Sequence, residues 1–220
     1  MNLPNAITIL RVALVPLVAW LLFQPSPTLR VLSFVVFLAA ALSDLVDGSL
    51  ARSRGEITNL GKLIDPIADK LLLTVTLISF FILTRGDPGL GGIPLFGGIA
   101  TWVLVVFIGR EAIVTALRGA AAHRGVVVAA GPSGKRKALA QNVFLGAMIL
   151  WIAYRTAAAL NGWTGTLNGF WRGFHGWFTT ISLLVALALT VYSLAVYLAV
   201  FRRVLSADPG ADGFDQPRGG

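Results

Sequence analysis

The chain has 220 residues, of which 56% are hydrophobic and only 13% are charged. Its mean hydropathy of +0.78 exceeds what a soluble domain of this size can bury, and therefore indicates an integral membrane protein. The absence of cysteine excludes disulfides, thiolate metal sites and cysteine nucleophiles.

Apolar segments along the chain predict an all-α protein with six transmembrane helices. A helix crosses the bilayer core with about 20 apolar residues. Four of the six uncharged stretches approach or exceed that length, and the two that fall short flank residues 43–70. Gly- and Pro-rich breaks separate the segments. We predict helices at residues 6–24, 29–53, 60–84, 94–120, 136–156 and 176–203.

These helices are expected to form one membrane domain over residues 1–205, followed by a tail. The tail, residues 206–220, is polar and rich in Gly and Pro, which predicts disorder. The N-terminal sequence MNLPNAITILRV has no basic leader before its apolar run. We therefore expect a retained first helix rather than a signal peptide.

The basic residues predict an orientation in the membrane. Eleven of them lie on the side that holds the N-terminus, residues 43–70 and the C-terminus, and four lie on the other side. Because basic residues accumulate on the cytoplasmic side, we expect both termini and residues 43–70 to face the cytoplasm from the inner (plasma) membrane. The four on the opposite side are Arg30, Arg85, Arg155 and Arg172.

Four aspartates stand out in this apolar chain. Asp44 and Asp47 are three residues apart, and Asp65 and Asp69 are four apart, so each pair shares one helix face. If the two helices pack antiparallel through a short turn, the four carboxylates converge. Small residues continue the same faces and leave room for a bulky ligand: Gly48, Ala51 and Gly61.

Four converging carboxylates require a cation to offset their repulsion and desolvation. Hard divalent cations such as Mg²⁺ take oxygen ligands, and paired metal sites are typical where a phosphate is attacked. Two plainer interpretations are a solvated loop with scattered acids and a structural cluster neutralised by Arg52 and Lys70. Neither explains the small residues on the acidic faces.

The spacing resembles the signature of the CDP-alcohol phosphotransferase family. The stretch reads Asp44-x2-Asp47-Gly48-x2-Ala51-Arg52-x8-Gly61-x3-Asp65-x3-Asp69 and matches that signature at every fixed position. The resemblance implies six transmembrane helices, usually in a homodimer, with the active site open to the cytoplasm.

The resemblance also implies roles for these residues. Asp44, Asp47, Asp65 and Asp69 would hold two divalent metals, Mg²⁺ or Mn²⁺, and Asp69 would be the general base. The donor would be CDP-diacylglycerol. Its cytidine diphosphate would be bound by the remaining signature residues and three of the acids: Asp44, Asp47, Gly48, Ala51, Arg52, Gly61 and Asp65.

The signature does not specify the acceptor, but two other stretches do bear on it. MNLPNAITILRVALVP and GREAIVTALRGAAAHRGVVVAAGPSGKRKALAQ resemble family members that use glycerol 3-phosphate. A phosphorylated acceptor needs cations, and Arg and Lys both bind phosphate. We interpret Arg110, Arg118, Lys135 and Lys137 as the acceptor-phosphate site. Topology and anionic headgroups also favour basic residues here, so this alternative stays open.

Other interpretations remain. Inositol phosphate or phosphatidylglycerol could replace glycerol 3-phosphate as acceptor, and intramembrane prenyltransferases also use Asp-rich Mg²⁺ sites. A divalent-cation transporter would show broken helices or acids along a pathway. We expect no nucleic-acid partner.

Asn5 and Arg11, at the start of the first helix, are candidates for the donor site, although we favour a snorkelling interfacial position for Arg11.

Overall fold

A computed structural model describes residues 3–54, 59–123 and 131–206; within these ranges, the side chains of residues 3–8, 44–54, 59–66, 69 and 203–206 lie outside the description. All regular structure in these ranges is helical. The helices are α1 (Leu3–Phe23), α2 (Pro27–Arg54), α3 (Asn59–Gly86), α4 (Pro88–Gly91), α5 (Thr101–His123), α6 (Pro132–Leu160) and α7 (Thr166–Ser206).

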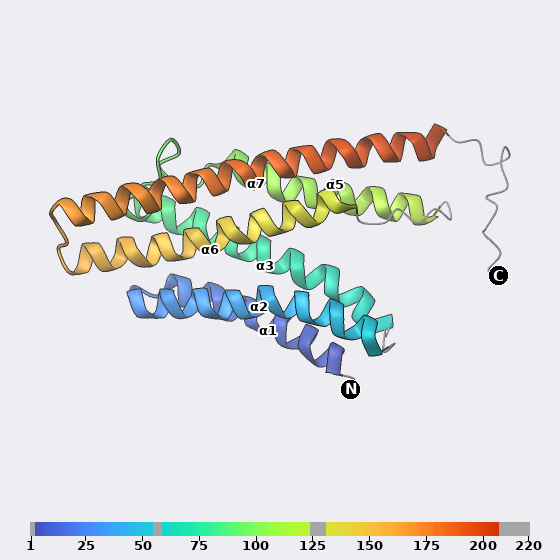
Figure 1. Cartoon of the computed structure of the whole chain (residues 1–220), viewed down its shortest axis with the longest axis horizontal. Coiled ribbons are helices and arrows are strands. Elements are labelled where there is room, and N and C mark those ends of the chain that lie inside the picture. The colour runs from blue at the N-terminus through green and yellow to red at the C-terminus, as the bar shows by residue number, and fades with distance from the viewer. Residues whose placement is uncertain (1–2, 55–58, 124–130, 207–220) are drawn as a thin grey trace.

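The helices form one elongated bundle (Figure 1). Helix α1 packs against α2 and α3, α6 packs against α2 and α7, and α5 packs against α7. The start of α1, the end of α2 and the start of α3 lie at the same end of the bundle. Helix α6 runs antiparallel to α2, so it ends where α2 begins (Figure 1). The α6–α7 connection therefore lies at the end of the bundle opposite to the start of α1.

The core of the bundle is apolar and aromatic. Phe144 of α6 lies at its centre, with ring centroids 6.4 Å from Phe80 of α3 and 6.2 Å from Phe107 of α5. All three side chains are fully buried. Polar side chains between helices bond mainly to backbone or to each other: the Ser33 hydroxyl donates to the Val18 carbonyl at 2.9 Å. Such interhelical hydrogen bonds are typical of helices packed within a membrane.

Two helices in the described ranges are long and apolar enough to cross a membrane. They are α6 and the part of α7 from Thr166 to Arg202. The apolar parts of α1 and α2, Ile9–Phe23 and Pro27–Ser43, are shorter. Six long helices are present among the described residues, as predicted, but the count of six membrane spans stays a prediction.

Two helix starts differ from the prediction by seven residues or more. Helix α5 begins at Thr101 rather than residue 94, because Leu95 and Gly97 have φ of 69° and 67°, outside the helical region. Helix α7 begins at Thr166 rather than residue 176. Its first turns carry an aromatic cluster in which the His175 ring lies 5.6 Å from Trp151 of α6. This packing stabilises helix through a Gly-rich segment that propensity alone disfavours.

The backbone between α3 and α5 is packed so closely at Gly91 that a larger residue there should lower the stability of the protein. Gly91 is buried, and a Cβ there would overlap the backbone carbonyl oxygen of Gly97. We expect Gly91→Ala to destabilise the protein by about 3 kcal/mol, because the clash is with backbone that cannot rotate away. Thermal unfolding in detergent measures this effect. Gly109→Ala is the control, since its Cβ would meet nothing within 4 Å; an equal loss in both variants contradicts the prediction.

Candidate active site

The four signature aspartates lie on two consecutive helices. Asp44 and Asp47 belong to the C-terminal part of α2, and Asp65 and Asp69 belong to the N-terminal part of α3. Only residues 55–58 separate the two helices. The side chains of these aspartates, and those of the other signature residues, lie outside the described side chains, so their convergence stays a prediction. The other signature positions are Gly48, Ala51, Arg52 and Gly61.

A cavity of about 320 Å³ lies beside these helix segments. Four of its described lining residues belong to the Asp-bearing helices: Ala41, Lys70, Leu72 and Leu73. Ala41 lies three residues before Asp44, and Lys70 directly follows Asp69. Helices α5 and α6 complete its lining. The structure brings together all four cations that the sequence assigned to the acceptor phosphate: Arg110, Arg118, Lys135 and Lys137.

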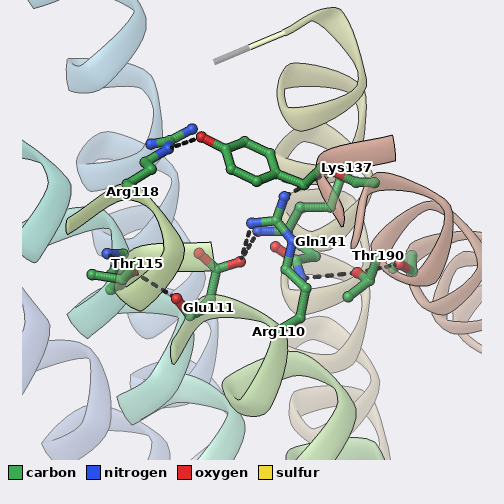
Figure 2. A network of polar contacts seen from close by, with 11 residues as sticks. Arg110, Glu111, Thr115, Arg118, Lys137, Gln141 and Thr190 are labelled. Atoms are coloured by element: carbon green, nitrogen blue, oxygen red, sulfur yellow. Dashed lines mark hydrogen bonds and ion pairs between the residues drawn. The ribbon is translucent and has the colours of Figure 1, made fainter. Parts of the chain in front are cut away.

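Glu111 holds two of these cations in the cavity wall. Its Oε1 atom accepts a hydrogen bond from Nη1 of Arg110 at 3.0 Å and also pairs with Nζ of Lys137 (Figure 2). Arg110 is 7% exposed, and its Nη2 donates to the Ser193 hydroxyl of α7 at 2.7 Å. Because three elements fix these groups, their charges are preorganised rather than freely mobile.

Arg118 lies eight residues after Arg110 on α5, and a side chain of α7 fixes its orientation. Its Nε donates to the Tyr197 hydroxyl at 2.6 Å, and its guanidinium lies 5.2 Å from the centre of the same ring (Figure 2). A hydrogen bond and a cation–π contact to one side chain restrict the guanidinium to one orientation. Lys135 is exposed at the first turn of α6.

Lys70 links the Asp-bearing helix α3 to the cavity. Its Nζ donates to the Thr115 hydroxyl at 2.5 Å, and that hydroxyl donates to the Glu111 carbonyl at 2.6 Å (Figure 2). The cavity is therefore tied to α3 at the residue next to Asp69. Among the side chains that the structure describes, five cations and one carboxylate line the cavity, so this part of its lining carries a net positive charge.

The contributions of α7 were missed in the sequence. Thr190, Ser193 and Tyr197 are three and four residues apart and share one face of an otherwise apolar helix. The Thr190 hydroxyl accepts a hydrogen bond from Nε2 of Gln141 at 3.1 Å. The spacing of these three residues could have predicted that this face of α7 contacts other helices, because polar side chains inside an apolar helix usually face the protein interior.

Arg11 does not snorkel to an interface, so the favoured interpretation was wrong. Its side chain is 1% exposed, and its Nε donates to the Ser43 hydroxyl of α2 at 3.1 Å. Ser43 directly precedes Asp44. A buried guanidinium at this place requires polar partners, and the neighbouring helix provides at least one.

Comparison with known proteins agrees with the sequence signature. The profile of the CDP-alcohol phosphatidyltransferase family matches residues 1–205. A Bacillus subtilis protein named CDP-diacylglycerol–glycerol-3-phosphate 3-phosphatidyltransferase is 36% identical over 161 residues, which cover 68% of this chain and 77% of the relative. A Mycobacterium tuberculosis protein named probable phosphatidylglycerophosphate synthase is 36% identical over 152 residues, covering 68% of this chain and 66% of that relative.

A more distant relative spans more of the chain. A Streptomyces coelicolor protein named cardiolipin synthase (CMP-forming) is 27% identical over 221 residues, covering 96% of this chain and 88% of that relative. The family profile covers both Asp-bearing helices and every described lining residue of the 320 Å³ cavity, which we call the cationic cavity. Two helices are long and apolar enough to cross a bilayer. The chain is therefore a membrane protein of the CDP-alcohol phosphatidyltransferase family.

Proposed function

We propose that the protein transfers the phosphatidyl group of CDP-diacylglycerol to sn-glycerol 3-phosphate, giving phosphatidylglycerophosphate and CMP. The observation that carries this proposal is the cationic cavity, which gathers Arg110, Arg118, Lys135 and Lys137 next to the helix of Asp69. A volume of about 320 Å³ suits a small phosphorylated alcohol. The two relatives that are 36% identical carry names for this reaction.

The donor site is assigned to the signature on α2 and α3. Carboxylates from two helices are the oxygen donors that Mg²⁺ and Mn²⁺ prefer, so the residue types fit two such ions. Asp44, Asp47, Asp65 and Asp69 would hold them, and the ions would neutralise charge on the donor pyrophosphate. The other donor contacts are assigned to Gly48, Ala51, Arg52 and Gly61.

The transfer step needs one base and one leaving group. A hydroxyl oxygen of glycerol 3-phosphate attacks the phosphorus attached to diacylglycerol, and the bond from that phosphorus to the oxygen of CMP breaks. CMP leaves with the electron pair of that bond. Asp69 takes the proton of the attacking hydroxyl. Lys70 anchors α3 through Thr115. We assign to this contact the positioning of Asp69 beside the cavity that would hold the acceptor.

The acceptor phosphate is assigned to the cationic cavity. Arg110 and Lys137 share Glu111, so each keeps charge available for a second anionic partner. Arg118 is fixed by Tyr197 and presents its remaining N–H donors for bidentate contact with phosphate. The carboxylate of Glu111 reduces the repulsion between Arg110 and Lys137 before the acceptor binds.

The membrane arrangement completes the proposal. We place six spans in the inner (plasma) membrane as a homodimer, with the Asp-bearing ends facing the cytoplasm. The excess of basic residues on that side and the shared end of α1, α2 and α3 support this orientation (Figure 1). Ser206, the first residue of the segment 206–220 that we propose to be disordered, is the last residue of α7, and residues 207–220 lie outside the described residues.

Arg118→Ala should raise the KM for glycerol 3-phosphate about tenfold and leave the KM for CDP-diacylglycerol nearly unchanged, because one phosphate contact is lost. Steady-state kinetics with each substrate varied in turn measures both constants. Tyr197→Phe is the matched control, since it removes the hydroxyl that orients Arg118 but keeps the charge; we expect a smaller rise. Equal changes in both KM values contradict the assignment of Arg118.

Phosphatidylglycerol is a second candidate acceptor, because the relative named cardiolipin synthase aligns over 96% of this chain. Mass spectrometry of the lipid product separates the candidates. Purified protein receives CDP-diacylglycerol, Mg²⁺ and one acceptor at a time: glycerol 3-phosphate, phosphatidylglycerol or inositol 1-phosphate. We expect phosphatidylglycerophosphate as the product. Cardiolipin or an inositol phospholipid instead would keep the Asp chemistry and overturn the acceptor.

A further inference from the structure

Two adjoining cavities are lined by residues on both sides of the α6–α7 connection. That connection lies at one end of the bundle (Figure 1). The smaller one, about 260 Å³, is lined by Asp87, Arg155 and Arg172 among others; we call it the distal cavity. The larger one, about 750 Å³, is mainly apolar and is called the aromatic cavity. The two share three lining residues: Tyr154, Trp163 and Asn168.

The distal cavity contains two guanidinium groups, and neither forms an ion pair with a carboxylate among the described side chains; the charge of Asp87 acts favourably on Arg155 without such a contact. Nε of Arg155 donates to the Gly89 carbonyl at 2.7 Å, and its guanidinium lies 5.7 Å from the centre of the Trp151 ring. These contacts hold Arg155 in place while its terminal nitrogens have no bonded partner in the described part of the chain. Arg172 makes no hydrogen bond there, and its like charge acts unfavourably on Arg155.

A single carboxylate lines the distal cavity within the described residues. Asp87 caps α4, and its Oδ1 accepts a hydrogen bond from the Gly89 backbone N–H at 2.8 Å. Two guanidinium groups and one carboxylate leave a net positive cavity. An anion between Arg155 and Arg172 would relieve their mutual repulsion and satisfy their free N–H donors.

The aromatic cavity indicates what the anion is attached to. Trp163, Leu167 and Trp171 line it and are 48%, 82% and 47% exposed. Contiguous apolar side chains of this kind mark a surface that another molecule covers. Tryptophan is enriched at the membrane–water interface, at the depth of lipid headgroups. A molecule that is anionic at one end and apolar at the other matches the paired cavities.

We propose that the distal cavity binds the phosphate of an anionic phospholipid, whose glycerol and first acyl carbons lie along the aromatic cavity. A zwitterionic lipid is disfavoured, because its cationic headgroup would face Arg155 and Arg172. Asp69 and Gly86 are seventeen positions apart along α3, a rise of about 25 Å. The site is therefore distinct from the candidate active site and does not depend on the proposed reaction.

Quenching of tryptophan fluorescence tests this site, because Trp163 and Trp171 line the aromatic cavity. Full-length protein in uncharged detergent is titrated with phosphatidylglycerol brominated on its acyl chains, and in parallel with brominated phosphatidylcholine. We expect saturable quenching by the anionic lipid at concentrations about tenfold lower than those needed for the zwitterionic one. Equal titration curves for the two lipids would overturn the proposal.

Three variants sharpen the test. Arg172→Gln should weaken binding of the brominated phosphatidylglycerol about tenfold, and it breaks no bond among the described residues. Asp87→Asn keeps an oxygen to cap α4 and removes the negative charge, so binding should tighten. Arg85→Gln is the matched control, since Arg85 is an exposed cation at the same end that lines neither cavity. Equal loss in Arg172→Gln and Arg85→Gln contradicts a defined site.

Inorganic phosphate distinguishes a lipid from a free anion as the ligand. Sodium phosphate at millimolar concentration, with sodium chloride at matched ionic strength as control, is added to the complex with brominated phosphatidylglycerol. We expect both salts to reduce quenching only slightly and equally, because phosphate cannot replace the contacts in the aromatic cavity. Displacement by phosphate alone would assign the cavity to a free phosphate and overturn the lipid assignment.

Discussion

Asp69→Asn should reduce turnover at least about a thousandfold while leaving cytidine nucleotide binding largely in place. Asparagine keeps the size and one oxygen of the side chain but cannot accept the proton of the attacking hydroxyl. If Asp69 is chiefly the base, the donor remains bound by the other three aspartates. Steady-state CMP release measures turnover, and equilibrium binding of a cytidine nucleotide in the presence of Mg²⁺ measures the donor site.

Asp87→Asn is the control for this experiment, because Asp87 directly follows Gly86, the last residue of α3, at the end of that helix opposite to Asp69. It should retain turnover close to that of the unmodified protein. Loss of nucleotide binding in Asp69→Asn would assign Asp69 to the metals rather than to the base. Undiminished turnover would remove it from the reaction altogether.

Arg110→Gln should raise the KM for glycerol 3-phosphate about a hundredfold, or roughly 2.7 kcal/mol. The effect exceeds that expected for Arg118→Ala, because Arg110 is 7% exposed and its charge acts in a space screened from water. The substitution also leaves Glu111 paired with Lys137 alone. Steady-state kinetics at saturating donor, together with thermal unfolding, separates loss of acceptor binding from loss of structure.

Ser193→Ala serves as the control for Arg110. It removes the hydroxyl that accepts from Nη2 of Arg110 but keeps the guanidinium and its pair with Glu111. We expect a KM change of a fewfold at most, since a neutral partner contributes about 1 kcal/mol. An Arg110→Gln enzyme with an unchanged acceptor KM and normal stability would exclude Arg110 from the acceptor site.

The long helices followed from apolar periodicity and breakers, whereas their starts depended on contacts that a sequence does not display. Helix α6 begins at Pro132, four residues before the predicted start, because Pro suits the first helical position. Helix α7 extends through Gly169, Gly173 and Gly176, since its His175 side chain packs against Trp151 of α6. Short helix α4 depends on one capping contact of Asp87 and was not predicted.

The site divides in the same way. Spacing predicted that the aspartates share two helix faces, because three- and four-residue intervals define a helix face, and their roles came from the family resemblance. The convergence of their side chains stays a prediction. The four cations were proposed from charge and chemistry, and the structure places them around one cavity. Their partners could not be derived, because Glu111, Ser193 and Tyr197 meet them only through tertiary packing of α5, α6 and α7.

The most direct test of the proposed reaction is CMP release by the purified protein from CDP-diacylglycerol, with and without glycerol 3-phosphate. Each reaction is run with Mg²⁺, with EDTA in excess of the metal, and with Mg²⁺ restored. The proposal predicts CMP only when acceptor and metal are both present, and full recovery on restoring Mg²⁺. CMP release that continues in EDTA, or that is indifferent to glycerol 3-phosphate, would contradict it.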